Sequence, residues 1–171
     1  FEIKTLITHD METGHRRDAG GDWVEIASPE YPAQPEGEVD MEPFRQIPIP
    51  WATKLLWTLE AGPAERPGRL WAGTIPGGLF VSEDRGDSWS LVRSLWDDPL
   101  RKEWTGGGYD YPGLHSVCPD PRTPDALLVG VSTGGVWRTD DGTATWSLGT
   151  GLRNEYMPPG QEYEPVGQDA H

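Results

Sequence analysis

The fold is decided by one short stretch of sequence, Ser82-Glu83-Asp84-Arg85-Gly86-Asp87-Ser88-Trp89. Its glycine permits the positive φ of a tight turn, and its aspartate can accept hydrogen bonds from nearby backbone groups. Its tryptophan supplies apolar area that covers the turn. Variants of the pattern S/T-x-D-x-G-x-x-W recur at 16–23 and 139–146. The residues assigned to these turns are Asp18, Gly20, Trp23, Ser82, Asp84, Gly86, Trp89, Thr139, Asp141 and Trp146. We expect their aspartates to be structural.

The repeat extends well beyond the turn. Residues 70–81 align without gaps on residues 127–138, at an offset of 57 residues. The same offset relates Trp89 to Trp146, and a nearly equal one relates Trp57 to His115 and then to His171. A period of this length is typical of one four-stranded blade of a β-propeller plus a loop.

Each unit of the repeat predicts four short antiparallel strands separated by Gly, Pro and Asp clusters. In the first unit they cover 54–60, 69–74, 78–83 and 88–93, and in the second 114–118, 126–132, 136–139 and 145–148. Gly77-Gly78 and Gly134-Gly135 are expected to form the hairpin turns between the second and third strands. No helix is predicted, because no long segment shows the 3.6-residue period.

The prediction is therefore an all-β protein, a single β-propeller over 1–171 with two complete blades at 54–93 and 114–149. The other segments are a partial blade with a Pro/Glu-rich connection (1–53), an aromatic and Gly-rich loop (94–113) and the start of a further blade (150–171). Propellers usually close with four to eight blades. Either the chain is a piece of a longer protein, which we favour, or an oligomer supplies the remaining blades.

Composition bounds the partners and the compartment. The formal net charge of −14 argues against nucleic acid and anionic membranes, which both require a basic surface. No window approaches 18 apolar residues and no signal peptide is recognisable, so a cytoplasmic location is expected, although the chain starts at Phe1 rather than Met. Cys118 has no second cysteine to pair with, and we expect it to be a small buried side chain.

The turn pattern resembles the Asp-box, or BNR, repeat of sialidases, sortilin-type receptors, xyloglucanases and a group of bacterial BNR-repeat proteins. The bacterial group is the most similar, on the runs 79–89, 95–108, 114–117, 120–122 and 134–142. The resemblance covers about residues 16–171. It implies a propeller, and members about twice this long, often described as sialidase-like or glycosyl hydrolase-like. Two residues depart from the pattern: Thr143 replaces the expected glycine, which predicts a distorted turn, and Arg16 replaces Ser or Thr.

The loop 94–113 is the first candidate for binding. It is expected to pass over one mouth of the propeller channel, where Trp96, Trp104, Tyr109 and Tyr111 could stack against a sugar or another flat ligand. Polar partners would come from Asp97, Asp98, Arg101 and Asp110. The alternative is that these aromatic side chains only pack the loop onto the blade.

The second candidate is a divalent metal in the central channel. His115 and His171 fall at equivalent positions of innermost strands and could bind a metal as neutral imidazoles. Trp57 occupies the same position in the preceding unit, so the ring of ligands would be incomplete. The alternative is that both histidines hydrogen-bond to neighbouring backbone.

Two functions remain from the sequence. One is a propeller that binds a small molecule, carbohydrate or protein at the channel mouth, without catalysis. The other, implied by the resemblance, is an exo-sialidase-like glycoside hydrolase, and whether the protein is an enzyme stays open. The motif F-R-I-P, which carries the first of three carboxylate-binding arginines in sialidases, is only echoed at 44–48, where Gln46 interrupts it. We therefore favour binding.

Overall fold

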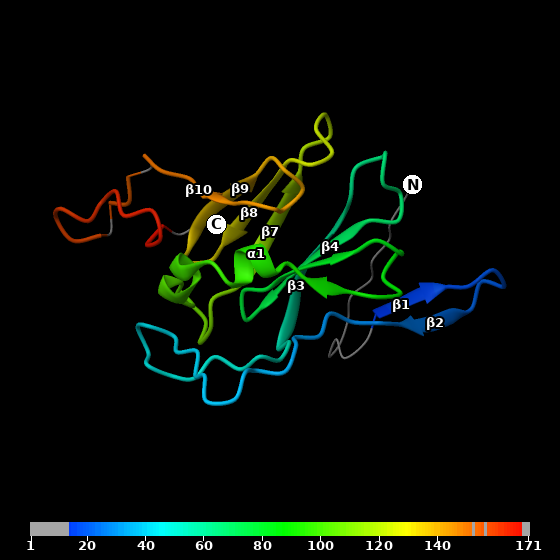
Figure 1. Ribbon diagram of the computed structural model, residues 1–171, viewed down its shortest axis with the longest axis horizontal. Helices are drawn as coiled ribbons and strands as arrows, with labels where there is room; N and C mark the ends of the chain where they lie inside the picture. The colour runs from blue at the N-terminus through cyan, green and yellow to red at the C-terminus, as the bar shows by residue number, and fades with distance from the viewer. Residues whose placement is uncertain (1–13, 152, 156, 169–171) are drawn as a thin grey trace.

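The protein is all-β, with two four-stranded antiparallel sheets each built from consecutive strands (Figure 1). The computed structural model describes residues 14–151, 153–155 and 157–168. The first sheet contains β3 (Leu55–Ala61), β4 (Leu70–Ile75), β5 (Leu79–Ser82) and β6 (Ser90–Leu91). The second contains β7 (Leu114–Pro119), β8 (Leu127–Val131), β9 (Gly135–Thr139) and β10 (Ser147–Leu148). A separate hairpin pairs β1 (Gly14–Arg17) with β2 (Trp23–Ile26).

The predicted strands of both units are confirmed, with ends that differ by at most two residues. The expectation of no helix was wrong for the loop 94–113, which contains α1 (Arg93–Trp96) and the 3₁₀ helix η1 (Pro99–Glu103). Both are too short to show a hydrophobic period. The Asp98 side chain accepts a hydrogen bond from Leu100 N at 2.9 Å and so caps η1, with Pro99 in its first turn.

The first strands of the two sheets are equivalent even in their irregularity. The pairing of β3 with β4 shifts between Leu56 and Thr58, and the pairing of β7 with β8 shifts between Leu114 and Ser116. The additional residues are Trp57 and His115, which the repeat predicted to be equivalent, and their ring centroids lie 5.8 Å apart. The internal repeat of the sequence is therefore a structural repeat.

The main core lies between the two sheets. Trp71 and Leu79 of the first sheet belong to one buried apolar cluster with Leu114, Val129 and Trp137 of the second. The glycine at 73 is required here, because a Cβ on it would meet the Leu114 carbonyl oxygen at 2.3 Å. The sheets therefore pack face to face, with β7 of the second sheet against β3 and β4 of the first.

The opposite face of the second sheet is open. Val117 is buried against the first sheet, and because side chains alternate along a strand, its neighbour Cys118 points to the other face. Cys118 is exposed there, so the expectation of a buried cysteine was wrong. Its cross-strand partner Leu128 is 44% exposed, whereas Trp71, one repeat earlier, is only 4% exposed.

No helix of the described residues has the length and apolar character needed to cross a membrane.

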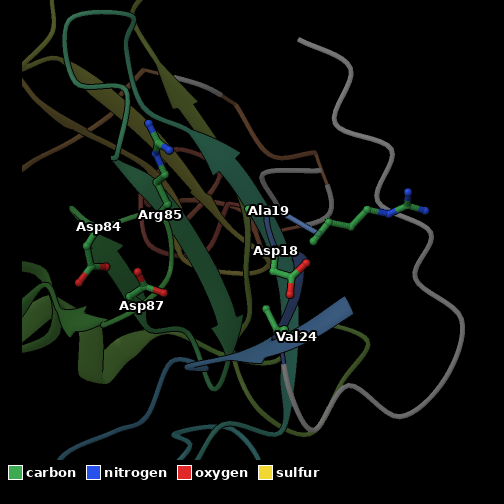
Figure 2. Close-up of a pocket in the computed structure, with 7 residues that line it drawn as sticks. Asp18, Ala19, Val24, Asp84, Arg85 and Asp87 are labelled. Atoms are coloured by element: carbon green, nitrogen blue, oxygen red, sulfur yellow. The ribbon is translucent and has the colours of Figure 1, made fainter. Parts of the chain in front are cut away.

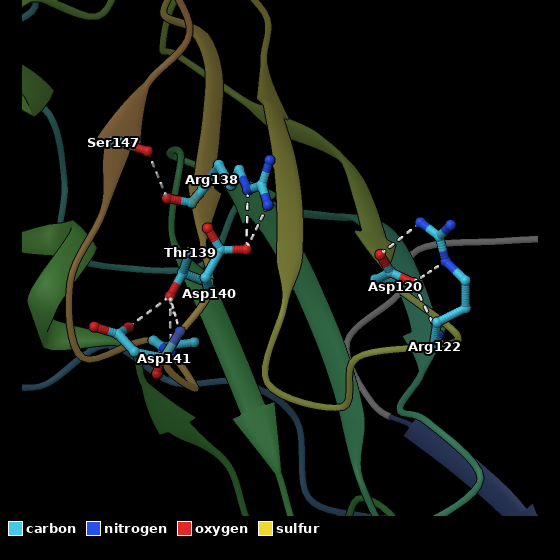
Figure 3. Close-up of polar contacts among 8 residues, drawn as sticks. Asp120, Arg122, Arg138, Thr139, Asp140, Asp141 and Ser147 are labelled. Carbon is cyan, nitrogen blue, oxygen red and sulfur yellow. Dashed lines mark hydrogen bonds and ion pairs between the residues drawn. The ribbon is translucent and has the colours of Figure 1, made fainter.

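The turns 82–89 and 139–146, called here the Asp84 turn and the Asp141 turn, each have the same pattern of internal hydrogen bonds. Figure 3 shows the contact between Thr139 and Asp141 in the second of them. In the Asp84 turn the carboxylate accepts bonds from the N–H (2.8 Å) and the hydroxyl (2.6 Å) of Ser88. In the Asp141 turn Thr145 makes the same bonds at 2.9 and 2.6 Å. The aspartates thus hold the turns, in agreement with the expected structural role.

The substitution at Thr143 does not distort its turn. Arg85 and Gly86 have φ of 65° and 91°, and the equivalent Gly142 and Thr143 have φ of 70° and 79°. Both turns therefore need two successive residues with positive φ, and the glycine has only moved by one position. The expectation of a distorted turn was wrong, because Thr143 adopts the left-handed conformation itself.

We expect Thr143→Gly to raise the free energy of unfolding by about 1 kcal/mol, because a β-branched residue at φ 79° is strained. Chemical denaturation measures the change. Thr143→Ala is the matched control, since it keeps a Cβ and should gain much less. Equal stability of the glycine and alanine variants would contradict the strain at this position.

The first copy of the pattern forms a different turn. In the hairpin of β1 and β2, Asp18 accepts bonds from Gly20 N (2.8 Å) and Asp22 N (3.0 Å), and only Gly21 has a positive φ. Trp23 is 61% exposed and does not cover the turn. The assignment of Asp18, Gly20 and Trp23 to an equivalent turn was therefore wrong in detail. The physical reason is that this copy lacks both hydroxyl groups that the other two use.

The hydroxyl donors make the two turns sensitive to acid. Hydrogen bonds from Ser88 to Asp84, and from Thr145 to Asp141, lower the pKa of each carboxyl group from 3.8 to about 2. The folded pKa lies below the unfolded one, so this contribution to stability is complete above about pH 3.8 and is lost as the pH falls toward 2. Carboxyl-carbon NMR titration should show Ser88→Ala raising the pKa of Asp84 toward 3.8, while Ser90→Ala leaves it unchanged.

Candidate functional site

The loop 94–113 crosses the end of the molecule where the two Gly-rich hairpins lie. A Cβ on Gly77 or Gly134 would meet the Trp104 ring at 3.3 or 2.8 Å, so the ring sits directly on these turns. Thr105 N donates to Thr133 O at 2.9 Å and fixes the loop to the second hairpin. We call this end of the molecule, with the loop and both hairpins, the loop end.

Two predicted ligand-stacking residues belong instead to the core. Trp96 and Trp104 are both buried, and Trp104 packs against Trp137 with ring centroids 5.6 Å apart. Neither ring has a face open to a ligand, so the expectation of a stacking platform was wrong for these two. The large rings bury apolar area against glycine turns that leave room for them.

The segment between β2 and β3 contributes the partners that the sequence did not reveal. In Figure 1 it runs alongside the region of α1 and η1. Tyr31 packs against Phe80 and Trp96, and its hydroxyl donates to Pro76 O at 2.6 Å. Burial raises the pKa of Tyr31, so this hydroxyl stays protonated and can act as a donor. The connection 27–53, between β2 and β3, and the loop 94–113 are the two long connections of the chain. They therefore form one packed unit.

A buried ion pair joins these connections. Arg101 donates to Asp40 at 2.5 Å, both side chains are buried, and the guanidinium lies 4.0 Å from the centroid of the Trp96 ring. Arg101 was predicted as a polar partner for a ligand, but it is committed to Asp40 and Trp96. Asp98, also predicted, caps η1. No sequence signal pairs Asp40 with Arg101, since 61 residues separate them.

The exposed groups of the loop end come from both connections. Tyr109 is 47% exposed, and Phe44, at the tip of a tight loop, is 81% exposed. Arg45 links the two connections: its guanidinium donates to Gly107 O at 3.2 Å and lies 3.8 Å from the Asp110 carboxylate. Phe44, Arg45, Tyr109 and Asp110 are therefore among the groups that a ligand can reach here. Sequence reasoning found Tyr109 and Asp110 as candidates, whereas Phe44 and Arg45 were considered only as part of the interrupted F-R-I-P motif and set aside.

Of the two histidines in the metal hypothesis, only His115 lies among the described residues. His115 is half-buried, and its Nδ1 lies 2.7 Å from the Ser116 hydroxyl. His171 lies outside the described residues. Among residues 14–151, 153–155 and 157–168, no group of three His, Cys, Asp or Glu side chains is placed to hold a metal ion. The metal site stays a prediction without a described ligand set.

An open surface pocket of about 540 Å³ lies elsewhere, between the tip of the first hairpin and the Asp84 turn. Figure 2 shows that Asp18, Ala19 and Val24 line one side, and Asp84, Arg85 and Asp87 line another. The carboxylates of Asp18 and Asp84 are used within their own turns. We therefore assign no ligand to this pocket.

These observations define a class, an all-β repeat protein with one elaborated end. Comparison with protein-family models and with curated proteins gave no match to this chain. The relation to Asp-box proteins accordingly stays a prediction that rests on the residues of the turns.

Proposed function

We propose that the two sheets are successive blades of an Asp-box β-propeller that binds a ligand or partner at the loop end. The order of the strands supports this proposal, since β3 and β7 are the first strands of their sheets and pack against one another. A propeller requires consecutive sheets that pack face to face, with the first strand of each sheet next to the first strand of the following one.

Tryptophan contacts between units repeat in the same way. Trp146 of the second sheet donates to the Ser94 hydroxyl at 3.0 Å, just after the last strand of the first sheet. Trp89 of the first sheet donates to Ala27 O at 3.0 Å, just after β2. Each of these tryptophans thus holds its unit to the preceding one, and the hairpin of β1 and β2 takes the place of the outer half of a blade.

The open face of the second sheet supports further blades. Leu128 and Cys118 are exposed where the equivalent face of the first sheet is covered. The position that is apolar and buried against the next sheet in the first unit is also apolar in the second unit, but exposed. This favours a further sheet that covers it. We propose that the remaining blades come from a longer chain or from an oligomer.

The observation that carries the binding function is the construction of the loop end. Its base is rigid, because a buried ion pair and packed tryptophans join the two long connections. Its surface presents Phe44, Tyr109, Arg45 and Asp110, which combine aromatic faces with hydrogen-bonding groups. Long ordered connections held by a scaffold are common places for binding.

A panel of glycans and small metabolites, assayed for both binding and turnover, tests this function. Binding without turnover is expected, and it should be weakened about tenfold or more by Tyr109→Ala. Leu100→Ala, which alters an exposed residue of η1, should leave it unchanged. Hydrolysis of a glycan would instead support the glycoside hydrolase. Binding that Tyr109→Ala leaves unchanged would remove the loop end as the site.

A further inference from the structure

We infer that Phe44 anchors a protein partner, inserting its ring into an apolar pocket bordered by lysine or arginine side chains. The inference rests on the proposed function in one respect, that binding takes place at the loop end. It differs in naming a class of partner and the residue on which the affinity depends.

Phe44 is presented on a closed, tight loop. Its exposed fraction, 81%, is the largest among the exposed large hydrophobic side chains of the described residues. Met41 and Pro48 form an antiparallel bridge, and Glu42 N donates to Ile47 O at 2.9 Å. Gln46 N returns to Glu42 O at 2.9 Å, with Gln46 itself at a φ of 56°. These bonds leave Phe44 at the tip, where its ring does not contribute to the core.

Buried acidic groups hold this loop in place. The Glu42 side chain is fully buried and accepts a hydrogen bond from Arg45 N, and Gly106 N lies 3.4 Å from its second oxygen. Asp40, two residues earlier, pairs with Arg101. Burial of carboxylates carries a desolvation cost that hydrogen bonds must offset. Buried polar contacts thus stabilise the loop, while Phe44, the largest apolar side chain of this loop, stays exposed to water.

A fixed, exposed aromatic ring is suited to act as a binding anchor. A partner gains the burial of the whole ring, and little conformational entropy is lost because the loop is already ordered. Aromatic residues surrounded by partly polar contacts commonly dominate the affinity of protein interfaces. The contact of Arg45, the residue after Phe44, with Asp110 provides polar surroundings of this kind. Isolated exposed apolar residues are common, but the loop that carries Phe44 is fixed by the buried Asp40 and Glu42 side chains.

The charge of the loop end selects the partner. The connections 27–53 and 94–113 together carry nine acidic and three basic residues. Of the basic residues, Arg101 is buried against Asp40, and Arg45 lies against Glu42 and Asp110. A partner with a basic rim around its pocket would therefore be attracted to this surface, whereas an acidic one would be repelled.

Site-specific photocrosslinking tests the inference. Phe44 is replaced by photoreactive p-benzoylphenylalanine, and the full chain is irradiated in an extract of the cells that make it. Val39, also exposed and on the same connection, receives the same group as the control. The protein joined only through position 44 is then purified, and its affinity for the unmodified chain is measured by calorimetry.

We expect Phe44→Ala to weaken this affinity by about 30-fold or more, Phe44→Trp to preserve most of it, and Val39→Ala to leave it unchanged. Raising the salt concentration should weaken it further. Three results overturn the inference: no adduct specific to position 44, an adduct only with a second copy of this chain, or binding insensitive to Phe44→Ala. If the glycan panel fails but this interaction is found, only the small-ligand part of the proposed function is lost.

Discussion

Trp137→Ala is expected to lower the free energy of unfolding by about 3–5 kcal/mol, the largest loss we foresee from a single apolar substitution. Trp137 is buried between the two sheets, packs against Trp104, and donates from its indole N–H to Gly134 O at 2.9 Å. Truncation leaves a cavity between the sheets and removes the partner of Trp104. Urea denaturation followed by circular dichroism measures the loss.

The matched control for this prediction is Trp23→Ala, the same change at an exposed position. Trp23 lies in the separate hairpin, with the Arg17 guanidinium 5.0 Å from its ring centroid. We expect a change of at most about 1 kcal/mol, as for an exposed cation–π contact. Similar losses in the two variants would show that the core does not lie between the sheets.

Arg101→Met is expected to cost about 3–5 kcal/mol for a different reason, because it leaves the Asp40 carboxylate buried without its partner. The methionine side chain replaces most of the apolar part of Arg101 that packs against Trp96. The loss of stability therefore comes mainly from the unpaired Asp40 carboxylate. Thermal and urea unfolding measure it. The loop end should also become more accessible to proteolysis, since the ion pair joins its two connections.

Removing both charges should restore most of the stability. In the double variant Asp40→Leu with Arg101→Met, no unpaired charge stays buried, and we expect a loss of about 1–2 kcal/mol at most. Arg138→Met, in the exposed pair with Asp140, is the control and should have no measurable effect. A double variant no more stable than Arg101→Met would mean that the pair is not buried together.

The sheets could be predicted from the sequence because their signals are local. Gly and Asp at the turns and apolar residues between them recur at a fixed offset, and this repeat located the strands of both units. It also related Trp57 to His115, and the structure adds that each lies at an irregularity in the first strand of its sheet, which was not predicted. Local turn chemistry and a period are sufficient for such a structure.

The loop end could not be predicted in the same way, because its contacts are long-range. Nothing near Arg101 in the sequence indicates that Asp40 will neutralise it, and Glu42 belongs to a stretch that reads as an acidic connection. Aromatic richness in the loop 94–113 was visible, but pattern alone does not separate a buried tryptophan from an exposed one. Trp96 and Trp104 are buried because other segments cover them, and Phe44 is exposed because its loop turns away.

The two equivalent turns have a consequence for recognising related repeats in other chains. Their glycine occupies either of two neighbouring positions, at Gly86 in one and at Gly142 in the other, so a search that demands glycine at one position overlooks one of these two turns. What both share is an aspartate with a hydroxyl residue two positions before it and another four positions after it. The hairpin around Asp18 has the aspartate and glycine but neither hydroxyl, and it folds differently. A hydroxyl–aspartate–hydroxyl spacing is therefore the better signature for annotating such repeats.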